Sequence, residues 1–187
     1  MTDQDAYFAY LKTRSRRAQL YRRIILYPLL NRHISGVALD VGCGLGDMLV
    51  FRPNTVGADV NPHCVKYCRS RGCDAHLIED GRFPFADESF DSVLLDNVLE
   101  HVSNPQPLLD EIHRVLKCGG TVLVGVPGER GYASDSDHKV FYDQPGLTAT
   151  LGAAGFEAHR VLHVPCRSRI LSRMLRQYCV YGVFRRQ

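Results

Sequence analysis

Three glycines alternate with larger residues directly after a short apolar segment that is typical of a buried strand. The segment covers 37–41 and includes Asp40, and the glycines that follow are Gly42, Gly44 and Gly46. Glycines at such a turn let the backbone bend sharply and come close to a ligand. The free amide groups at the start of the next helix point toward the same space. The segment therefore indicates a binding site for a nucleotide or a nucleoside.

The spacing of the glycines and the acids beside them narrow the choice of ligand. A dinucleotide site typically has the spacing G-x-G-x-x-G, whereas here the third glycine is Gly46 and Asp47 follows it. Asp47 at the helix start and Asp40 before the loop would both repel a pyrophosphate. Asp40 suits a ligand that carries an ammonium group. The pattern therefore disfavours a nicotinamide oxidoreductase.

A further carboxylate ends the next predicted strand. Asp59 follows the glycines at about the distance that places an acid against the ribose of an adenosine in a doubly wound sheet. One carboxylate can accept hydrogen bonds from both ribose hydroxyls. The alternative is that Asp59 only caps the helix that begins at Pro62.

The order of these segments resembles the class I S-adenosylmethionine-dependent methyltransferases, and in particular their small type 11 domains. The stretch 37–46 is similar to their first motif, a hydrophobic strand with an acid followed by G-C-G-x-G. The stretches 80–91 and 96–102 are similar to their F-P-F, D-x-S-F-D and V-L-E-H-V segments, and 151–156 is similar to L-x-A-A-G-F. Cys118 stands where the family usually has a proline. The resemblance covers roughly residues 34–164.

This resemblance implies S-adenosylmethionine as the cofactor and a set of residues that bind it. In the family, the acid at Asp80 accepts a hydrogen bond from the adenine amino group, and the amide at Gly81 meets a ring nitrogen. Phe83 or Phe85 would form part of an apolar wall for the adenine ring. The complete set expected to bind the cofactor is Asp40, Gly42, Cys43, Gly44, Gly46, Asp59, Val60, Asp80, Gly81, Asp96 and Asn97.

The order of the predicted elements indicates an α/β fold. Helices are predicted within 3–30, and strands near 37–41, 55–59, 74–78, 89–96 and 121–126 alternate with helices before a final pair near 156–164 and 178–184. With the resemblance, this predicts a Rossmann-like, doubly wound, mostly parallel seven-stranded sheet with an antiparallel last strand. We expect one methyltransferase domain over 1–187, with an N-terminal helical lid at 1–33 and a core at 34–187.

The sequence also predicts smaller features of the fold. Gly119 and Gly120 are expected to end a helix over about 105–116, and 129–143 is expected to be a long loop. In the N-terminal helices, an apolar stripe is expected to face the protein while the arginines face elsewhere. The stripe consists of Tyr7, Tyr10, Leu11, Leu20, Ile24 and Ile25.

The candidates for acid–base chemistry are two histidines. Methyl transfer displaces a neutral sulfur leaving group, so alignment of the acceptor supplies much of the acceleration. A hydroxyl acceptor must also lose a proton, and His138 and His101 are the best-placed bases. The alternative for His101 is that it only orients its loop. The chain lacks an Asn/Asp-Pro-Pro-Tyr segment, which argues against methylation of amino groups in DNA bases or glutamine.

Composition limits the remaining classes of protein. The chain has 187 residues, 45% of them hydrophobic, which is enough for one domain with an adequate core. It has no signal-peptide pattern and no apolar segment long enough to span a bilayer, so we expect a cytoplasmic protein. None of the seven cysteines forms C-x-x-C, so no metal site is expected.

The formal net charge of +3 is unevenly distributed. Residues 1–36 carry +5 and 160–187 carry +7, whereas 37–159 carry −9. Basic termini can attract an anionic acceptor, such as a phosphorylated or carboxylated metabolite, a lipid headgroup or RNA. The alternative is that these arginines are simply solvated on surface helices.

We therefore expect methyl transfer from S-adenosylmethionine to a small or lipid-linked metabolite, at oxygen. The alternatives are an RNA methyltransferase, which the basic termini favour, and a noncatalytic cofactor-binding scaffold subunit. The chain lacks a recognisable RNA-binding module, so nucleic acid is not the favoured partner. The intact set of glycines and acids argues against a noncatalytic subunit. Neither the acceptor nor the oligomeric state follows from the sequence.

Overall fold

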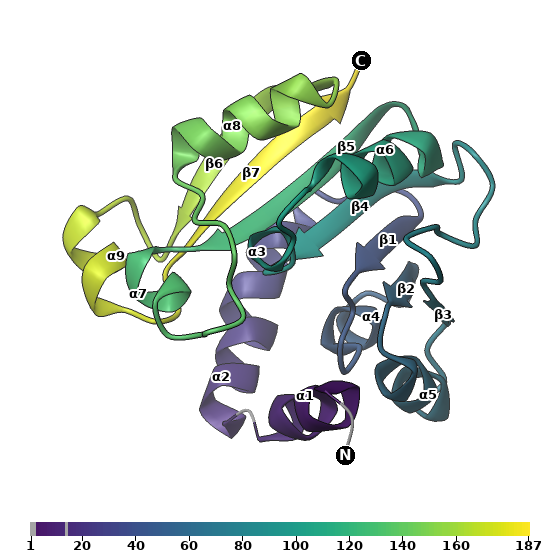
Figure 1. Ribbon diagram of the computed structural model, residues 1–187, viewed down its shortest axis with the longest axis horizontal. Coiled ribbons are helices and arrows are strands. Elements are labelled where there is room, and N and C mark those ends of the chain that lie inside the picture. Colours follow the sequence, from purple (N-terminus) through teal and green to yellow (C-terminus); the bar gives the residue numbers. More distant parts are fainter. Residues whose placement is uncertain (1–2, 14) are drawn as a thin grey trace.

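The computed structural model describes residues 3–13 and 15–187 and contains one seven-stranded sheet (Figure 1). The strand order is β3-β2-β1-β4-β5-β7-β6, and β7 runs antiparallel to both of its neighbours while β1 to β5 are parallel. The strands are β1 Ala38–Val41, β2 Thr55–Asp59, β3 Ala75–Leu77, β4 Phe90–Asp96, β5 Leu116–Pro127, β6 Phe156–Val164 and β7 Cys179–Arg186. This topology confirms the predicted Rossmann-like fold.

Helices pack on both faces of the sheet. They are α1 Asp3–Lys12, α2 Arg16–Tyr21, η1 Arg22–Leu26, α3 Tyr27–Asn31, α4 Asp47–Phe51, α5 Pro62–Ser70, η2 Leu99–His101, α6 Gln106–Val115, α7 Glu129–Tyr132, α8 Gln144–Ala153 and α9 Arg169–Met174.

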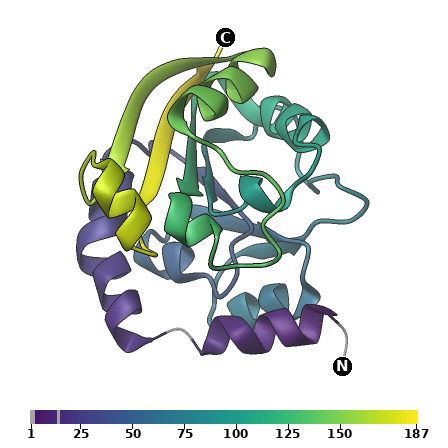
Figure 2. The ribbon, with the colours of Figure 1, turned by 60° about the vertical axis from the view of Figure 1, so that its left-hand side comes forward.

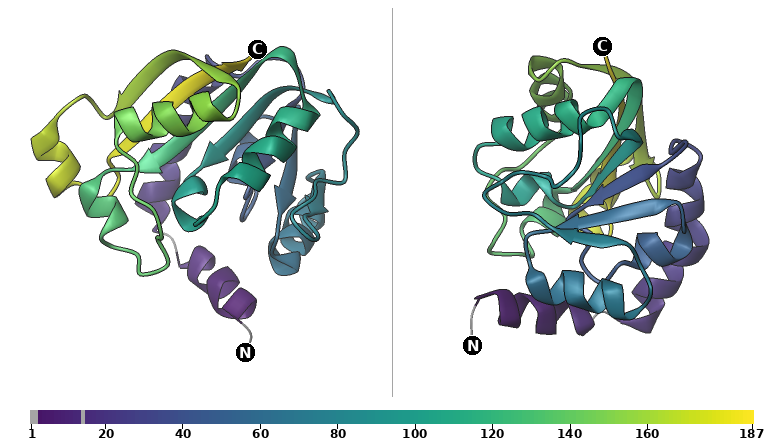
Figure 3. Two further views of the ribbon diagram at one scale, coloured as in Figure 1. Left: turned by 45° about the horizontal axis from the view of Figure 1, so that its top comes forward. Right: turned by 90° about the vertical axis from the view of Figure 1, so that its right-hand side faces the viewer.

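Neighbouring residues of β4 show how the two layers divide the core. Val93 and Leu95 pack with α6 and α8, whereas Leu94 packs with α3 and α4 on the opposite face. Successive side chains of a strand point to opposite faces, so a run of apolar residues serves both layers. Figure 3 shows the two helix layers on either side of the central strands.

The end of α6 differs from the prediction. The helix ends at Val115, and β5 begins at Leu116, which is fully buried and pairs with Phe90 of β4. Gly119 and Gly120 therefore lie within β5 and do not end the helix. Because Leu116 is buried in the sheet, the helix ends before the chain reaches the two glycines.

Two short helices were not predicted. α7 lies within the segment expected to be a loop, and α9 lies between the last two strands. They depend on each other, because the amide of Glu129 donates to Ser172 Oγ at 3.1 Å and Arg173 Nε donates to the Glu129 carboxylate at 3.0 Å. Contacts between segments this far apart in the sequence leave no local pattern.

The N-terminal segment forms helices as expected, but the predicted apolar stripe is wrong. Of its members only Leu11 is buried, at 1% exposure, whereas Leu20, Ile24 and Ile25 are each more than half exposed. The buried face consists instead of Leu26, Tyr27 and Leu30.

A π-turn over η1 changes which residues face the protein. Within it, the amide of Tyr27 bonds to the carbonyl of Arg22, five residues earlier. Pro28 follows and has no amide to continue the α-helical pattern.

Within the described ranges, no helix has the length and apolarity needed to cross a bilayer.

Candidate functional site

The glycine loop between β1 and α4 is held against the end of β2. The amides of Gly42 and Cys43 both donate to the carbonyl of Ala58, at 2.7 and 3.2 Å. Gly42 has a φ of +71°, and a Cβ at that position would lie 2.6 Å from a methyl carbon of Val98. Gly44 also has a positive φ, of +53°. The loop therefore presents bare backbone, as the sequence predicted.

The inner side of the loop belongs to the core. Cys43 packs against Leu49 and Cys68 in a small apolar cluster. A Cβ at Gly46 would lie 2.8 Å from Cys68 Sγ. The side chain of Cys43 is therefore committed to packing, and only its backbone is available to a ligand.

Asp59 joins the end of β2 to the glycine loop. Its Oδ2 accepts a hydrogen bond from the Gly44 amide and its Oδ1 accepts one from the Asn61 amide, both at 2.8 Å. Burial raises the pKa of Asp59, and these two amide hydrogen bonds oppose that rise. The side chain of Asn61 caps α5 by accepting a hydrogen bond from the His63 amide. The alternative that Asp59 caps this helix is therefore wrong. Each carboxylate oxygen has a further lone pair, and contact with ribose hydroxyls stays a prediction.

Two carboxylates and one guanidinium meet at the ends of β1 and β4. Arg22 forms an ion pair with Asp96, whose Oδ1 accepts from the Tyr181 hydroxyl at 2.7 Å and from the Asn97 side chain at 2.9 Å. Asp40 is 5% exposed, and its carboxylate has no hydrogen-bond partner among the described residues. Burial and the nearby Asp96 raise the pKa of Asp40 well above its usual range. A cationic group placed here would relieve the cost of burying that carboxylate.

Asp80 and Gly81 form an exposed turn after β3. Both have positive φ angles, of 50° and 74°. Phe83 is 3% exposed and belongs to the main core, whereas Phe85 is half-buried at its edge. Phe85 is therefore the aromatic side chain left beside this turn.

Helix α1 covers the glycine loop and α5 (Figure 2). Leu11 is 1% exposed and packs against Cys64 of α5. The side chain of Asn61 donates to the Gln4 carbonyl at 2.8 Å, and the Gln4 side chain donates to the Val60 carbonyl at 3.4 Å. These contacts attach α1 to α5 and the glycine loop, and its role as a lid stays a prediction.

The two predicted catalytic histidines lie side by side. The ring centroids of His101 and His138 are 4.6 Å apart. His101 Nδ1 lies 3.1 Å from a carboxylate oxygen of Asp137, and His138 Nδ1 lies 2.8 Å from the Tyr132 carbonyl. The side chain of His138 is 8% exposed and that of His101 is 23% exposed. His101 is therefore the more accessible imidazole.

A cavity of about 300 Å³ opens beside His101. Ala6, Tyr7 and Tyr10 of α1 line one side, and His101 and the segment 134–137 line the other. The cavity is large enough for a small acceptor and lies between the lid and the histidine pair.

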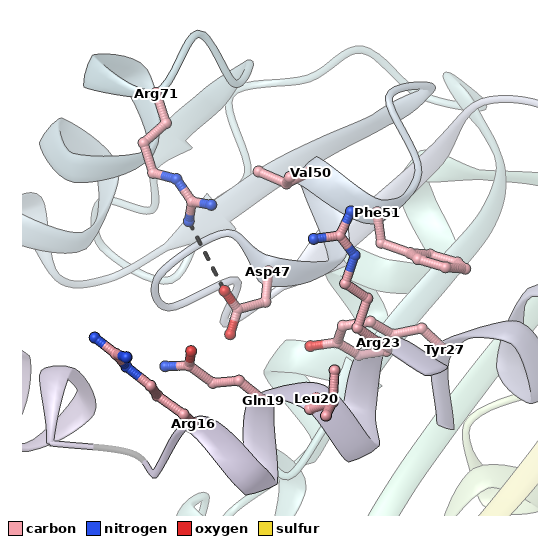
Figure 4. A pocket seen from close by; sticks show the side chains of 9 residues that line it. All are labelled: Arg16, Gln19, Leu20, Arg23, Tyr27, Asp47, Val50, Phe51 and Arg71. Atoms are coloured by element: carbon pink, nitrogen blue, oxygen red, sulfur yellow. Dashed lines mark ion pairs between the residues drawn. The ribbon is translucent and has the colours of Figure 1, made fainter. Parts of the chain in front are cut away.

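A second cavity, of about 280 Å³, lies between the N-terminal helices and α4 (Figure 4). Arg16 and Arg23 border it from the N-terminal helices, and Arg71 borders it from the end of α5. Arg71 lies 3.8 Å from Asp47, which is also in the wall. The excess of arginine makes this cavity suitable for an anionic group.

Comparison with known families supports the resemblance found in the sequence. Residues 39–124 match the model of the family described as a methyltransferase domain. This stretch of the chain is therefore similar to a methyltransferase domain. It begins in β1, ends in β5, and contains the glycine loop, Asp59 and Asp96.

The similar proteins include one that is uncharacterised and one that is named as a probable tRNA methyltransferase. This chain is 35% identical over 98 residues to an uncharacterised protein of Methanocaldococcus jannaschii, and the match covers 52% of this chain and 48% of that protein. It is 36% identical over 92 residues to the human probable tRNA methyltransferase 9B, covering 46% of this chain and 20% of that protein. The chain therefore matches about half or less of the length of these relatives.

A solved structure supports the fold over more of the chain. The structure is a SAM-dependent methyltransferase of Thermotoga maritima, described as a possible histamine N-methyltransferase. It superimposes with a TM-score of 0.75 and 19% identity, and the match covers 90% of this chain and 91% of that one. At this identity the likeness establishes the fold alone.

The sequence does not reveal the roles of three residues of this site. Arg22 lies among arginines expected at the surface, and Tyr181 lies in a predicted strand, yet both contact Asp96. Glu100 is completely buried beside His138, although nothing distinguished it from an exposed loop acid. Its position between Leu99 and His101 in the V-L-E-H-V segment was the one available signal.

Proposed function

We propose that the protein transfers the methyl group of S-adenosylmethionine to an oxygen of a small or lipid-linked, anionic metabolite. The observation that carries this proposal is the glycine loop placed between two buried carboxylates, Asp40 and Asp59, in a methyltransferase domain. Residues 1–187 act as one unit in this proposal, with 1–33 as the lid and 34–187 as the core.

Each part of the loop would hold a different part of the cofactor. Asp59 would accept hydrogen bonds from the ribose hydroxyls, while Asp80 and the Gly81 amide would meet the adenine edge. Asp40 would face the ammonium group, with Asp96 adding negative charge nearby. S-adenosylmethionine supplies, when bound, an electrophilic methyl group on a positively charged sulfur.

The histidine pair would act on the acceptor hydroxyl. His101 borders the cavity beside α1, so it is the imidazole that can touch an acceptor. An imidazole can take up a proton near neutral pH, which a hydroxyl must lose on methylation. His138 lies behind it and is fixed by the Tyr132 carbonyl, so it positions the pair.

The surface of the N-terminal helices supports an acceptor with both anionic and apolar parts. Leu20, Ile24 and Ile25 are exposed on the same helices that carry Arg16 and Arg23. Apolar side chains next to free cations suit a lipid-linked or similarly amphiphilic anion.

A cytoplasmic location belongs to this proposal as well. None of the seven cysteines, all of which lie in the described ranges, forms a disulfide. Cysteines without disulfides are usual where the surroundings are reducing.

A second candidate is methylation of RNA. The observation that favours it is the similarity to the human probable tRNA methyltransferase 9B, together with the basic termini. A noncatalytic scaffold subunit is the third alternative, and it predicts binding of the cofactor without methyl transfer.

One labelling experiment separates these functions. The full chain is incubated with methyl-labelled S-adenosylmethionine and, separately, with small metabolites, lipids or total tRNA. The proposal predicts label in the metabolite or lipid fraction and none with Gly42→Ala. Label confined to tRNA would replace the proposal with the RNA alternative. No label in any fraction, with cofactor binding intact, would favour the scaffold.

A further inference from the structure

Three side chains with metal-binding atoms meet behind the acceptor cavity. Glu100 and His101 belong to η2, and His138 comes from the segment between α7 and α8. One ligand atom from each lies within 4.8 Å of the other two. Among the described residues this is the single group of its kind, and it contains no cysteine.

The carboxylate of Glu100 is the first sign that a ligand belongs here. Glu100 is 0% exposed, and neither of its side-chain oxygens has a hydrogen-bond partner among the residues that the structure describes. Its backbone carbonyl accepts from the amides of Lys139 and Val140, at 2.7 and 3.1 Å, which fixes the loop that carries His138. A buried carboxylate without a partner is unfavourable, and a cation would offset that cost.

The orientation of His138 is the second sign. Its Nδ1 lies 2.8 Å from the Tyr132 carbonyl, which can only accept, so Nδ1 carries the proton. In the neutral ring, Nε2 then has a lone pair, and it faces Glu100 Oε1 at 3.8 Å. When Glu100 is ionised, two acceptors therefore face each other across a gap too long for a direct hydrogen bond. A cation between them would satisfy both.

One ring nitrogen of His101 is likewise held by a neighbouring acceptor. Its Nδ1 lies 3.1 Å from the carboxylate of Asp137, which leaves Nε2 free. Metal-binding histidines usually donate their second ring nitrogen to a carboxylate or a backbone carbonyl. Asp137 and the Tyr132 carbonyl supply one partner of each kind.

We propose that Glu100, His101 and His138 bind one divalent metal ion of the zinc type. Two imidazole nitrogens and one carboxylate oxygen are the donors that Zn²⁺ accepts readily, and three protein ligands leave a fourth position open. Since His101 also lines the cavity beside α1, that position is available to an acceptor oxygen.

A consequence for catalysis rests on the proposed function. With the metal bound, His101 would be a ligand and would not itself take the proton; the metal would make the acceptor hydroxyl more acidic and so replace that role. The metal site itself does not depend on that consequence.

Metal binding is measured on the full chain without cofactor or acceptor, so the result is independent of methyl transfer. The protein is stripped with a chelator and titrated with Zn²⁺ in competition with a chromophoric chelator, and with Co²⁺ by visible absorption. We expect one equivalent to bind, with visible bands typical of four-coordinate Co²⁺. Glu100→Gln and His138→Gln should each weaken binding at least a hundredfold, and Asp137→Asn by about tenfold.

Two controls make the assignment specific. His76→Gln removes a surface histidine whose Nε2 lies 2.8 Å from Asp74, and it should leave binding unchanged. Replacing the exposed Cys118 and Cys166 by serine should also leave it unchanged. If Glu100→Gln fails to fold, metal binding by His101→Gln, a substitution at a partly exposed residue, tests the proposal instead.

Three results would overturn the proposal. The first is the absence of stoichiometric binding. The second is binding that survives in folded His101→Gln, Glu100→Gln or His138→Gln. The third is binding that disappears with the two exposed cysteines.

Discussion

The proposed cofactor end and the proposed acceptor end of the site are built in different ways. The cofactor end is built mainly from one continuous stretch, 40–61, in which loop amides bond to the end of β2. The acceptor end combines α1, η2 and the segment between α7 and α8, which are far apart in the sequence (Figure 1). Backbone groups define the first, and side chains from several elements define the second. The difference shows that the acceptor end can change without altering the loop that holds the cofactor.

One ion pair joins the N-terminal helices to the cofactor end. Arg22, in η1, reaches Asp96 at the end of β4, next to Asp40 at the end of β1. The N-terminal helices are therefore attached to the cofactor end through a buried charge. Separating these two regions experimentally begins with this pair.

The largest effect is expected from Arg22→Leu. Removing one partner of a largely buried pair leaves Asp96 uncompensated, which typically costs about 3–5 kcal/mol. We expect a loss of that order in the free energy of unfolding, measured by urea titration. The control Arg23→Leu replaces an exposed neighbouring arginine and should change the free energy of unfolding by only about 0.5 kcal/mol. Equal losses in the two variants would show that Arg22 does not join the regions.

Gly42→Ala tests whether bare backbone is essential at the cofactor end. The new Cβ would lie 2.6 Å from Val98, at a φ of +71°. We expect about a hundredfold weaker binding of S-adenosylhomocysteine by calorimetry, since strain of this kind costs about 1–3 kcal/mol. Gly72→Ala has a φ of +76° and nothing within 4 Å, so it should leave binding unchanged. Similar weakening in both variants would attribute the loss to backbone strain alone.

Asp40→Asn separates stability from binding. The pKa of Asp40 is raised in the folded protein, so the fold keeps a proton that the unfolded chain releases above about 3.8. The contribution of Asp40 to stability is therefore complete below that pH and is lost as pH rises. The free energy of unfolding of the variant minus that of the wild type should increase with pH, by at most about 1.4 kcal/mol per unit.

The same substitution should reduce cofactor affinity, because the ammonium group loses a charged partner. We expect about a tenfold or larger loss, from roughly 1.5–3 kcal/mol for such a hydrogen bond. A pH-independent stability difference together with unchanged affinity would place Asp40 outside the cofactor end.

The smallest effect is expected at the arginine-lined cavity. Arg16→Gln should raise the KM for an anionic acceptor by a few-fold and reduce the dependence of turnover on salt, because exposed charges are screened. Arg17→Gln, on the same helix but outside the cavity wall, is the matched control. Equal changes in both variants would indicate a diffuse charge effect and no defined anion site.

The sequence predicted the backbone around the glycine loop well because its signals are local. β2 and β6 have the predicted bounds, and the glycines of the loop have positive φ angles. The acceptor end was predicted only in part, because Glu100 and His138 meet through contacts between distant segments.

The N-terminal stripe failed for a related reason. Periodicity assumes a regular α-helix, and the π-turn over η1 shifts the buried face to Leu26 and Leu30. Apolar residues such as Ile24 then remain at the surface, where the pattern alone cannot distinguish exposure from burial.

Calorimetry on Asp59 tests the central claim most directly. We expect the wild-type chain to bind S-adenosylhomocysteine and not NAD, and Asp59→Ala to bind at least tenfold more weakly while remaining folded by circular dichroism. Such a loss would locate the ribose at the end of β2. An unchanged dissociation constant in the folded variant, or binding of NAD by the wild type, would contradict the account.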